Sequence, residues 1–245
     1  RYRGNLKCDT YVHDQLSQQQ LIDLKEQIGF GGAEPCVILL AASSWPGEEQ
    51  LMLSVLARCI ALCIPVKLIL APRNPTRLNE ILPHVQKTKL TYQVRSQKSD
   101  IQQDNIIYIA DTIGELRSFY QISDVAFIGK SSEKNTGGQN PIEAAAFACA
   151  MVYGPNMQNF SDISNDLVNH NASVQAASDT EITEQLLFLL THADSRRQQV
   201  ISAKLWLDAN KDCAHHIYRA IESKLFNSKK NTPDDFSSLD IYPGL

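Results

Sequence analysis

The sequence predicts an α/β protein with a Rossmann-like parallel sheet and helices on both faces of that sheet. Short apolar runs rich in Val and Ile alternate with longer amphipathic segments along the 245 residues, as in a chain that alternates strands with helices. The apolar runs are continuous, which is typical of strands buried on both faces. With 43% hydrophobic residues, a chain of this length can bury a sizeable core.

The elements follow one another in a regular order. The first stretch is expected to hold a helix over residues 15–28 and a glycine-rich turn over 29–32, which has no strand before it and so is not a dinucleotide fingerprint. Apolar runs then predict strands over 36–41, 66–71, 91–95, 106–110, 124–129 and 151–154, with a weaker one over 172–176. Amphipathic periodicity predicts helices over 48–63, 75–87, 114–121, 141–148 and 160–168.

The C-terminal part is predicted to be helical over residues 180–226, with a break near Ala193 and Asp194. A polar tail that contains proline follows over 227–245, and we expect it to be a loosely held extension. The sequence therefore predicts one domain over residues 1–226 and an extension over residues 227–245.

Composition excludes several classes of partner. The formal net charge of −4 gives no electrostatic reason to bind nucleic acid or an anionic membrane surface. No apolar run reaches the length of a membrane span and no signal-peptide pattern is present, so we expect this piece to be soluble. Because the chain begins at Arg1, we expect it to be part of a longer protein.

Cysteine and histidine usage predicts neither a metal nor any other cofactor. None of the six cysteines forms a CxxC pair, and most lie in apolar runs where a free thiol packs as a small hydrophobe. Cys59 and Cys63 share a helix face, but no second pair or clustered histidine completes a metal site. The six histidines are scattered in polar settings. A reducing, cytoplasmic compartment fits this pattern.

The most informative motif is Gly-Gly-Gln-Asn-Pro-Ile-Glu at residues 137–143, after the predicted strand 124–129. It predicts a loop and then a helix with Asn140 as N-cap and Pro141 at its first position. Backbone N–H groups at such a start can bind a phosphate, and Glu143 can accept hydrogen bonds from sugar hydroxyls. The competing interpretation is a capping box, in which Asn140 and Glu143 bind only their own backbone.

Five polar loops follow predicted strands and therefore meet at the carboxyl edge of the sheet, where parallel sheets bind ligands. Arg73 directly follows a strand and suits bidentate binding of a phosphate, the alternative being an ion pair with Glu115. Ser43 and Ser44 can donate to a phosphate or carboxylate, or can cap the helix at Glu48. Other candidates lie in the loop after 106–110, where Gly114 can let the backbone approach a planar base and Ile113 can cover it, unless both merely begin a helix.

Six ordered motifs resemble the C-terminal half of 3-deoxy-D-manno-octulosonic acid (Kdo) transferases of lipopolysaccharide synthesis, over about residues 1–210. They are Gly4-Asn5-Leu6-Lys7, Ser43-Ser44-x-x-Gly47-Glu48-Glu49, Pro72-Arg73-x-Pro75-x-Arg77, Asp111-Thr112-x-Gly114-Glu115-Leu116, Gly137-Gly138-x-Asn140-Pro141-x-Glu143 and Gly154-Pro155-x-x-x-Asn159-Phe160.

The resemblance implies a GT-B glycosyltransferase, in which two Rossmann-like domains face each other across a cleft. The donor CMP-Kdo, or CMP, binds the C-terminal domain, and the N-terminal domain holds the lipid A precursor. Lys7 matches a lysine that stabilises charge in the transition state. The donor-binding residues that follow from the motifs are Ser43, Ser44, Glu48, Pro72, Arg73, Ile113, Gly114, Glu115, Gly138, Asn140, Pro141, Ile142, Glu143 and Asn159.

The resemblance further implies an inverting transfer whose catalytic base is a glutamate of the N-terminal domain. Since that domain is absent here, this piece is expected to bind the donor without transferring its sugar. The full-length enzyme would work at the cytoplasmic face of the inner membrane, and only the full-length protein would associate with the membrane.

The chain departs from the family pattern in three loops. Trp45 and Pro46 stand where the family often has His and Glu, and Gln139 and Asn156 replace frequent histidines. Two other functions stay open at this point. One is another GT-B nucleotide-sugar transferase or a sugar-nucleotide epimerase that uses a UDP-linked ligand, and the other is a non-catalytic nucleotide-binding domain.

Overall fold

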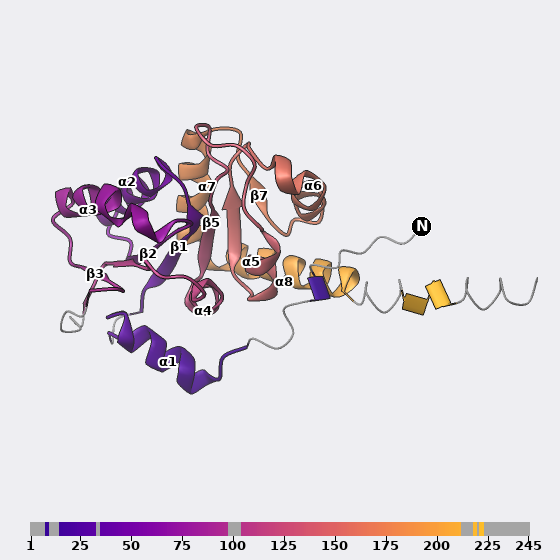
Figure 1. Cartoon of the computed structure of the whole chain (residues 1–245), viewed down its shortest axis with the longest axis horizontal. Coiled ribbons are helices and arrows are strands. Elements are labelled where there is room, and N and C mark those ends of the chain that lie inside the picture. Colours follow the sequence, from indigo (N-terminus) through magenta and orange to yellow (C-terminus); the bar gives the residue numbers. More distant parts are fainter. Residues whose placement is uncertain are drawn as a thin grey trace, which may run out of the picture.

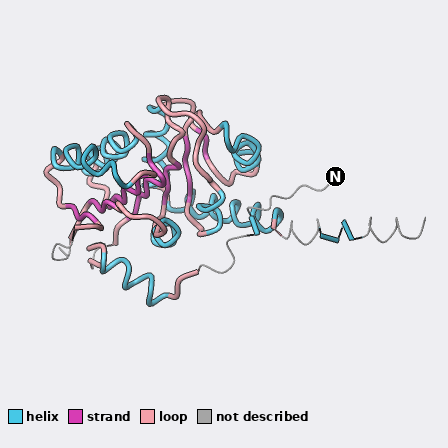
Figure 2. Tube along the Cα trace, viewed as in Figure 1, coloured by secondary structure: helices cyan, strands magenta, loops and turns pink. Residues whose placement is uncertain are grey.

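The computed structural model describes residues 8–9, 15–32, 35–97, 104–211, 218–219 and 221–222. Its centre is a seven-stranded sheet in the order β3-β4-β2-β1-β5-β6-β7, with parallel pairing throughout (Figures 1 and 2). The strands are β1 (Val37–Ser44), β2 (Val66–Pro72), β3 (Tyr92–Val94), β4 (Ile107–Ile109), β5 (Val125–Ile128), β6 (Ala150–Tyr153) and β7 (Val174–Gln175).

The chain moves from β1 to β2, β3 and β4 on one side, and then crosses to β5 on the other side of β1. The direction of winding therefore reverses between β1 and β5. Such a switch point, at the carboxyl ends of the strands, is where open α/β sheets bind ligands.

Helices cover both faces of the sheet (Figure 1). One face carries α1 (Gln18–Gln27), α4 (Leu116–Ile122), α5 (Ile142–Ala146) and α8 (Ala193–Asn210). The other carries α2 (Glu48–Ala61), α3 (Leu78–Lys87) and α7 (Asp179–Thr191), while α6 (Ser161–Asn169) packs beside β7. Short 3₁₀ turns, η2 (Pro75–Arg77) and η3 (Gln158–Phe160), precede α3 and α6.

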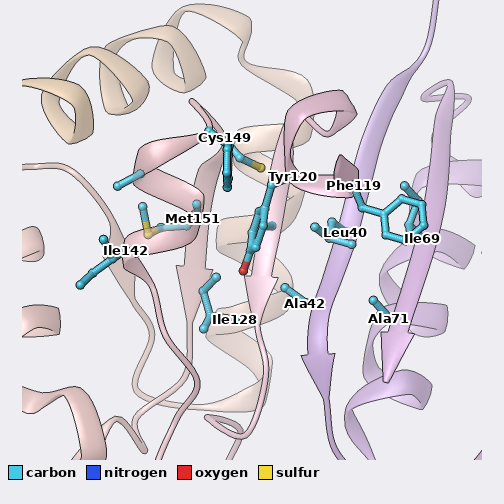
Figure 3. Close-up of a cluster of buried hydrophobic side chains, with 14 of the residues drawn as sticks. Leu40, Ala42, Ile69, Ala71, Phe119, Tyr120, Ile128, Ile142, Cys149 and Met151 are labelled. Carbon is cyan, nitrogen blue, oxygen red and sulfur yellow. The ribbon is translucent and has the colours of Figure 1, made fainter. Parts of the chain in front are cut away.

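The two cores follow from the two-residue period of the strands. In β1, Leu40 and Ala42 point to the face that packs against α4 and α5, and Figure 3 shows them beside Phe119 and Tyr120. Leu39 and Ala41 point to the face covered by α2. Because both sets are buried, positions 38–42 of the strand are all apolar, which explains the continuous run in the sequence.

The structure confirms the Rossmann-like fold and the order of the predicted strands and helices. Some elements end at other residues than predicted. Strand β1 continues to Ser44, and the break between α7 and α8 falls at His192. Lys7 and residues 227–245 lie outside the described residues, so the domain boundary at 226 stays a prediction. Among the helices that the structure describes, none combines the length and the apolar character that crossing a bilayer requires.

Candidate functional site

A cleft of about 770 Å³ opens at the carboxyl edge of the sheet, between the loops after β1, β2 and β4 and the start of α5. Its size lies in the range of small-molecule sites. The cleft brings together six of the residues predicted from the sequence, although they come from four separate stretches of chain. They are Ser43, Pro72, Arg73, Ile113, Gly114 and Glu143.

Arg73 is an exposed cation that lines this cleft. Its backbone N–H donates to the carbonyl of Ser44 at 3.0 Å, which holds the loop after β2 against the end of β1. Among the residues that the structure describes, no carboxylate forms an ion pair with the Arg73 guanidinium. The alternative interpretation, a pair with Glu115, is wrong, because Glu115 pairs with Arg95 at 2.8 Å.

Glu115 organises the loop after β4 and does not line the cleft. Partial burial of its carboxyl is outweighed by hydrogen bonds from Arg95 and Thr112, which lower the pKa of Glu115. Ile113, in the same loop, has 82% of its surface exposed at the cleft. Gly114 has a φ of +96° with open space beside its Cα, so the backbone conformation is what requires glycine there.

Glu143 lies in the first turn of α5 and enters the cleft from the side of β5. Its Oε1 lies 3.8 Å from Nε of Arg117 on α4. Burial raises the pKa of the Glu143 carboxyl, although Arg117 opposes this shift. The carboxylate therefore protonates at a higher pH than an exposed glutamate would.

The start of α5 differs from the prediction. The helix begins at Ile142 with Pro141, not Asn140, at the cap position, although Oδ1 of Asn140 still accepts the N–H of Ile142 at 3.1 Å. The side chain of Ile142 is fully buried in the core. With only five residues, α5 aligns few peptide dipoles, so we do not assign a phosphate site to its N-terminus.

Ser44 and Glu48 are buried residues that hold the loops of this edge in place. Both side chains are fully buried, and the Ser44 hydroxyl donates to Glu49 at 2.9 Å. Glu49 in turn binds both terminal nitrogens of Arg77, at 2.8 and 3.2 Å. These two side chains hold loops in place and do not line the cleft, so their contact with a donor stays a prediction.

Glu48 joins two loops of the carboxyl edge. Its carboxylate accepts the backbone N–H of Trp45 and Lys130 at 2.8 Å each, and those of Ser131 and Ser132 at 3.0 and 3.1 Å. Burial raises the pKa of Glu48 despite these four donors. One carboxylate thus fixes the loop after β1 relative to the loop after β5.

Gly138 and Asn159 lie farther along this edge and do not line the cleft. A Cβ at Gly138 would come within 2.5 Å of Sδ of Met157, and the φ of +70° also favours glycine. Asn159 is exposed, and its N–H donates to the carbonyl of Gly137 at 2.8 Å. The loops after β5 and β6 are joined in this way.

Sequence reasoning missed the cleft residues Arg117 and Thr112, and also Gln15, Leu16 and Gln20 near the start of α1. The N–H of Leu16 donates to the side chain of Gln121 on α4 at 2.7 Å, a bond that spans 105 positions of sequence. No local pattern could have indicated such a long-range pairing. Within the described ranges, no three His, Cys, Asp or Glu side chains gather as a metal site would require.

No protein family model matches the chain. Curated relatives include the 3-deoxy-D-manno-octulosonic acid transferases of Rickettsia bellii and Bordetella pertussis, each 30% identical. These matches cover 79% and 91% of this chain, but 44% and 51% of the relatives. The chain thus spans about half the length of the curated relatives it matches.

Solved structures agree with these relatives. The C-terminal CMP-Kdo binding domain of WaaA from Acinetobacter baumannii has a TM-score of 0.68 and 28% identity, over 78% of this chain and 99% of that domain. Anabaena Alr3699/HepE, solved with UDP and glucose, is 13% identical with a TM-score of 0.60 over 86% of this chain and 53% of that one, and shows the shared fold alone. The sequence relatives and the matching C-terminal domain lead to one conclusion: this chain resembles the 3-deoxy-D-manno-octulosonic acid transferases in sequence, and its GT-B-type fold matches the C-terminal domain of one protein solved with that fold.

Proposed function

We propose that this chain is the donor-binding domain of a Kdo transferase and that its ligand is CMP-Kdo. The observation that carries the proposal is the cleft of about 770 Å³, which combines an exposed guanidinium with a carboxylate at the carboxyl edge of the sheet. The similarity to a CMP-Kdo binding domain supports the choice of ligand.

The residues of the cleft have complementary roles in this proposal. Arg73 binds the phosphate of CMP through its planar fork of donors. Glu143 accepts hydrogen bonds from the ribose hydroxyls. Ile113 and the backbone at Gly114 lie against the cytosine, with Pro72 beside them. Because Arg73 is charged and has no ion pair among the described residues, it can neutralise the phosphate as the sugar departs.

In the whole protein, we propose direct displacement at the anomeric carbon of Kdo. A hydroxyl of the lipid A precursor attacks that carbon, its proton passes to a glutamate of the N-terminal domain, and the bond to the CMP phosphate breaks with inversion. Lys7, outside the described residues, would stabilise the leaving phosphate. This chain alone should bind the donor without transferring the sugar, because the base and the acceptor site belong to the other domain.

Titration calorimetry with CMP, UMP and UDP tests the ligand class. We expect CMP to bind more tightly than UMP, which has a different base, and more tightly than UDP, which adds a phosphate. A preference for UDP would contradict CMP-Kdo as the donor and would instead favour a GT-B enzyme with a UDP-linked substrate. No binding of any nucleotide would contradict the proposed site.

The raised pKa of Glu143 leads us to expect that its contribution to CMP affinity depends on pH. Replacing it with Gln should weaken CMP binding about 5-fold at pH 8, because an amide accepts fewer hydrogen bonds from ribose than a carboxylate does. As the pH falls through the raised pKa of Glu143, the wild-type carboxylate protonates and its advantage disappears. The affinities of wild type and Glu143→Gln should therefore converge at acidic pH.

Measuring the ratio of the two affinities removes the contribution of the CMP phosphate, which titrates equally in both experiments. A ratio that stays constant from pH 8 to acidic pH, or one close to unity throughout, would show that the Glu143 carboxylate does not contact the ribose.

A further inference from the structure

Lys130 is a further cation at the same edge of the sheet, in the loop whose first residue, Gly129, packs against Ser43 of the cleft. Lys130 follows β5 by two residues, and Trp45 follows β1, the strand beside it. The ammonium of Lys130 lies 4.5 Å from the centre of the Trp45 ring. These two residues therefore face each other at the switch point between β1 and β5, the position at which open α/β sheets bind ligands.

The backbone at Lys130 has a φ of +60°, in the left-handed region that a lysine seldom adopts. Glu48 maintains this conformation, because the same buried carboxylate accepts the N–H of Lys130 and that of Trp45. Unfavourable backbone conformations that the surroundings hold in place cluster at functional sites. The fold thus fixes both the lysine and the ring beneath it.

The ammonium has an aromatic surface on one side and further polar donors nearby. A Cβ built on Gly137 would lie 3.5 Å from Nζ of Lys130 and 2.7 Å from Nδ2 of Asn159, so both nitrogens pack against the Cα of this glycine and lie close to each other. No carboxylate in the described part of the chain forms an ion pair with Lys130. An ammonium and an amide beside an apolar ring are suited to an anionic group carried on a partly apolar ligand.

We propose that Lys130, held over Trp45, binds the carboxylate of the sugar acid that the nucleotide donor carries. This inference rests on the proposed function, since it assumes that CMP occupies the cleft. A nucleotide-linked sugar acid carries two anionic groups, a phosphate and a carboxylate. Arg73 is assigned to the phosphate and Arg117 faces Glu143, whereas Lys130 forms no ion pair among the described residues, and we therefore assign it to the carboxylate.

Replacing Lys130 with Gly tests this proposal without threatening the fold, because glycine adopts a φ of +60° without strain. We expect the variant to bind CMP-Kdo about 10-fold more weakly than wild type, the scale of one hydrogen bond to a charged group. Its affinity for CMP should stay within about 2-fold. Lys130→Arg should retain most of the CMP-Kdo affinity, because it keeps the charge.

Lys134→Ala is the matched control, since it removes an exposed lysine from the same loop. It should bind both ligands as wild type does. If Lys130→Gly binds CMP-Kdo as tightly as wild type while CMP binding still depends on Arg73, the carboxylate site is wrong and the proposed function stands. If wild type does not bind CMP, both are wrong. An equal loss for CMP and CMP-Kdo in Lys130→Gly would also overturn the inference, because the lysine would then contact the nucleotide.

Discussion

Replacing Glu48 with Ala is expected to lower the free energy of unfolding by about 3–5 kcal/mol. The side chain is fully buried, and its carboxylate accepts four backbone N–H groups from two loops. Alanine would leave these donors without an acceptor inside the protein, and each buried unpaired group is costly. It would also release the strained backbone of Lys130 from the bond that holds it.

Urea denaturation followed by circular dichroism measures this loss. Glu48→Gln should fall between wild type and Glu48→Ala, because one acceptor oxygen remains while the new NH₂ group faces N–H donors. Glu184→Ala, an exposed position on α7, should change the free energy of unfolding by less than about 0.5 kcal/mol. A Glu48→Ala variant as stable as that control would mean that the loops do not depend on this carboxylate.

The sequence predicts the fold well because strands and helices are indicated by patterns of neighbouring residues. Within the predicted strand 124–129, residues 125–128 are all apolar, and the structure places β5 at Val125–Ile128. A continuous run also indicates burial on both faces, hence parallel pairing and helices on each side. The helix starts are less well determined: at α5 the sequence places the cap at Asn140 and the structure places it at Pro141, a shift within the usual uncertainty of helix ends.

The candidate site is predicted less completely, because neighbouring residues of a loop can face opposite ways. Ser43 has a φ of +53° and lines the cleft, whereas Ser44 is buried beneath it. Their sequence context is nearly the same, and only the backbone conformation separates them. Arg73 and Gly114 were predicted to lie together because each follows a parallel strand, but Arg117 enters the cleft from a helix whose orientation depends on packing.

Replacing Arg73 with Ala is expected to weaken CMP binding about 10- to 100-fold, the scale of losing charge-assisted hydrogen bonds to a phosphate. Arg73 is exposed and has no ion pair among the residues described, so its removal leaves no buried carboxylate unpaired. The free energy of unfolding should therefore stay within about 0.5 kcal/mol of wild type. Arg73→Lys should recover part of the affinity, because an ammonium retains the charge without the planar fork of donors.

Cytidine is the control ligand that isolates the phosphate. It lacks the group that Arg73 is proposed to bind, so wild type and Arg73→Ala should bind cytidine equally, and weakly. If the substitution weakens cytidine as much as CMP, then Arg73 shapes the cleft and does not bind the phosphate. If it weakens neither, the phosphate lies elsewhere. The proposal is supported only if Arg73→Ala loses affinity for CMP and not for cytidine, and Arg73→Lys recovers part of the CMP affinity. The guanidinium at the end of β2 would then be the group that neutralises the leaving phosphate.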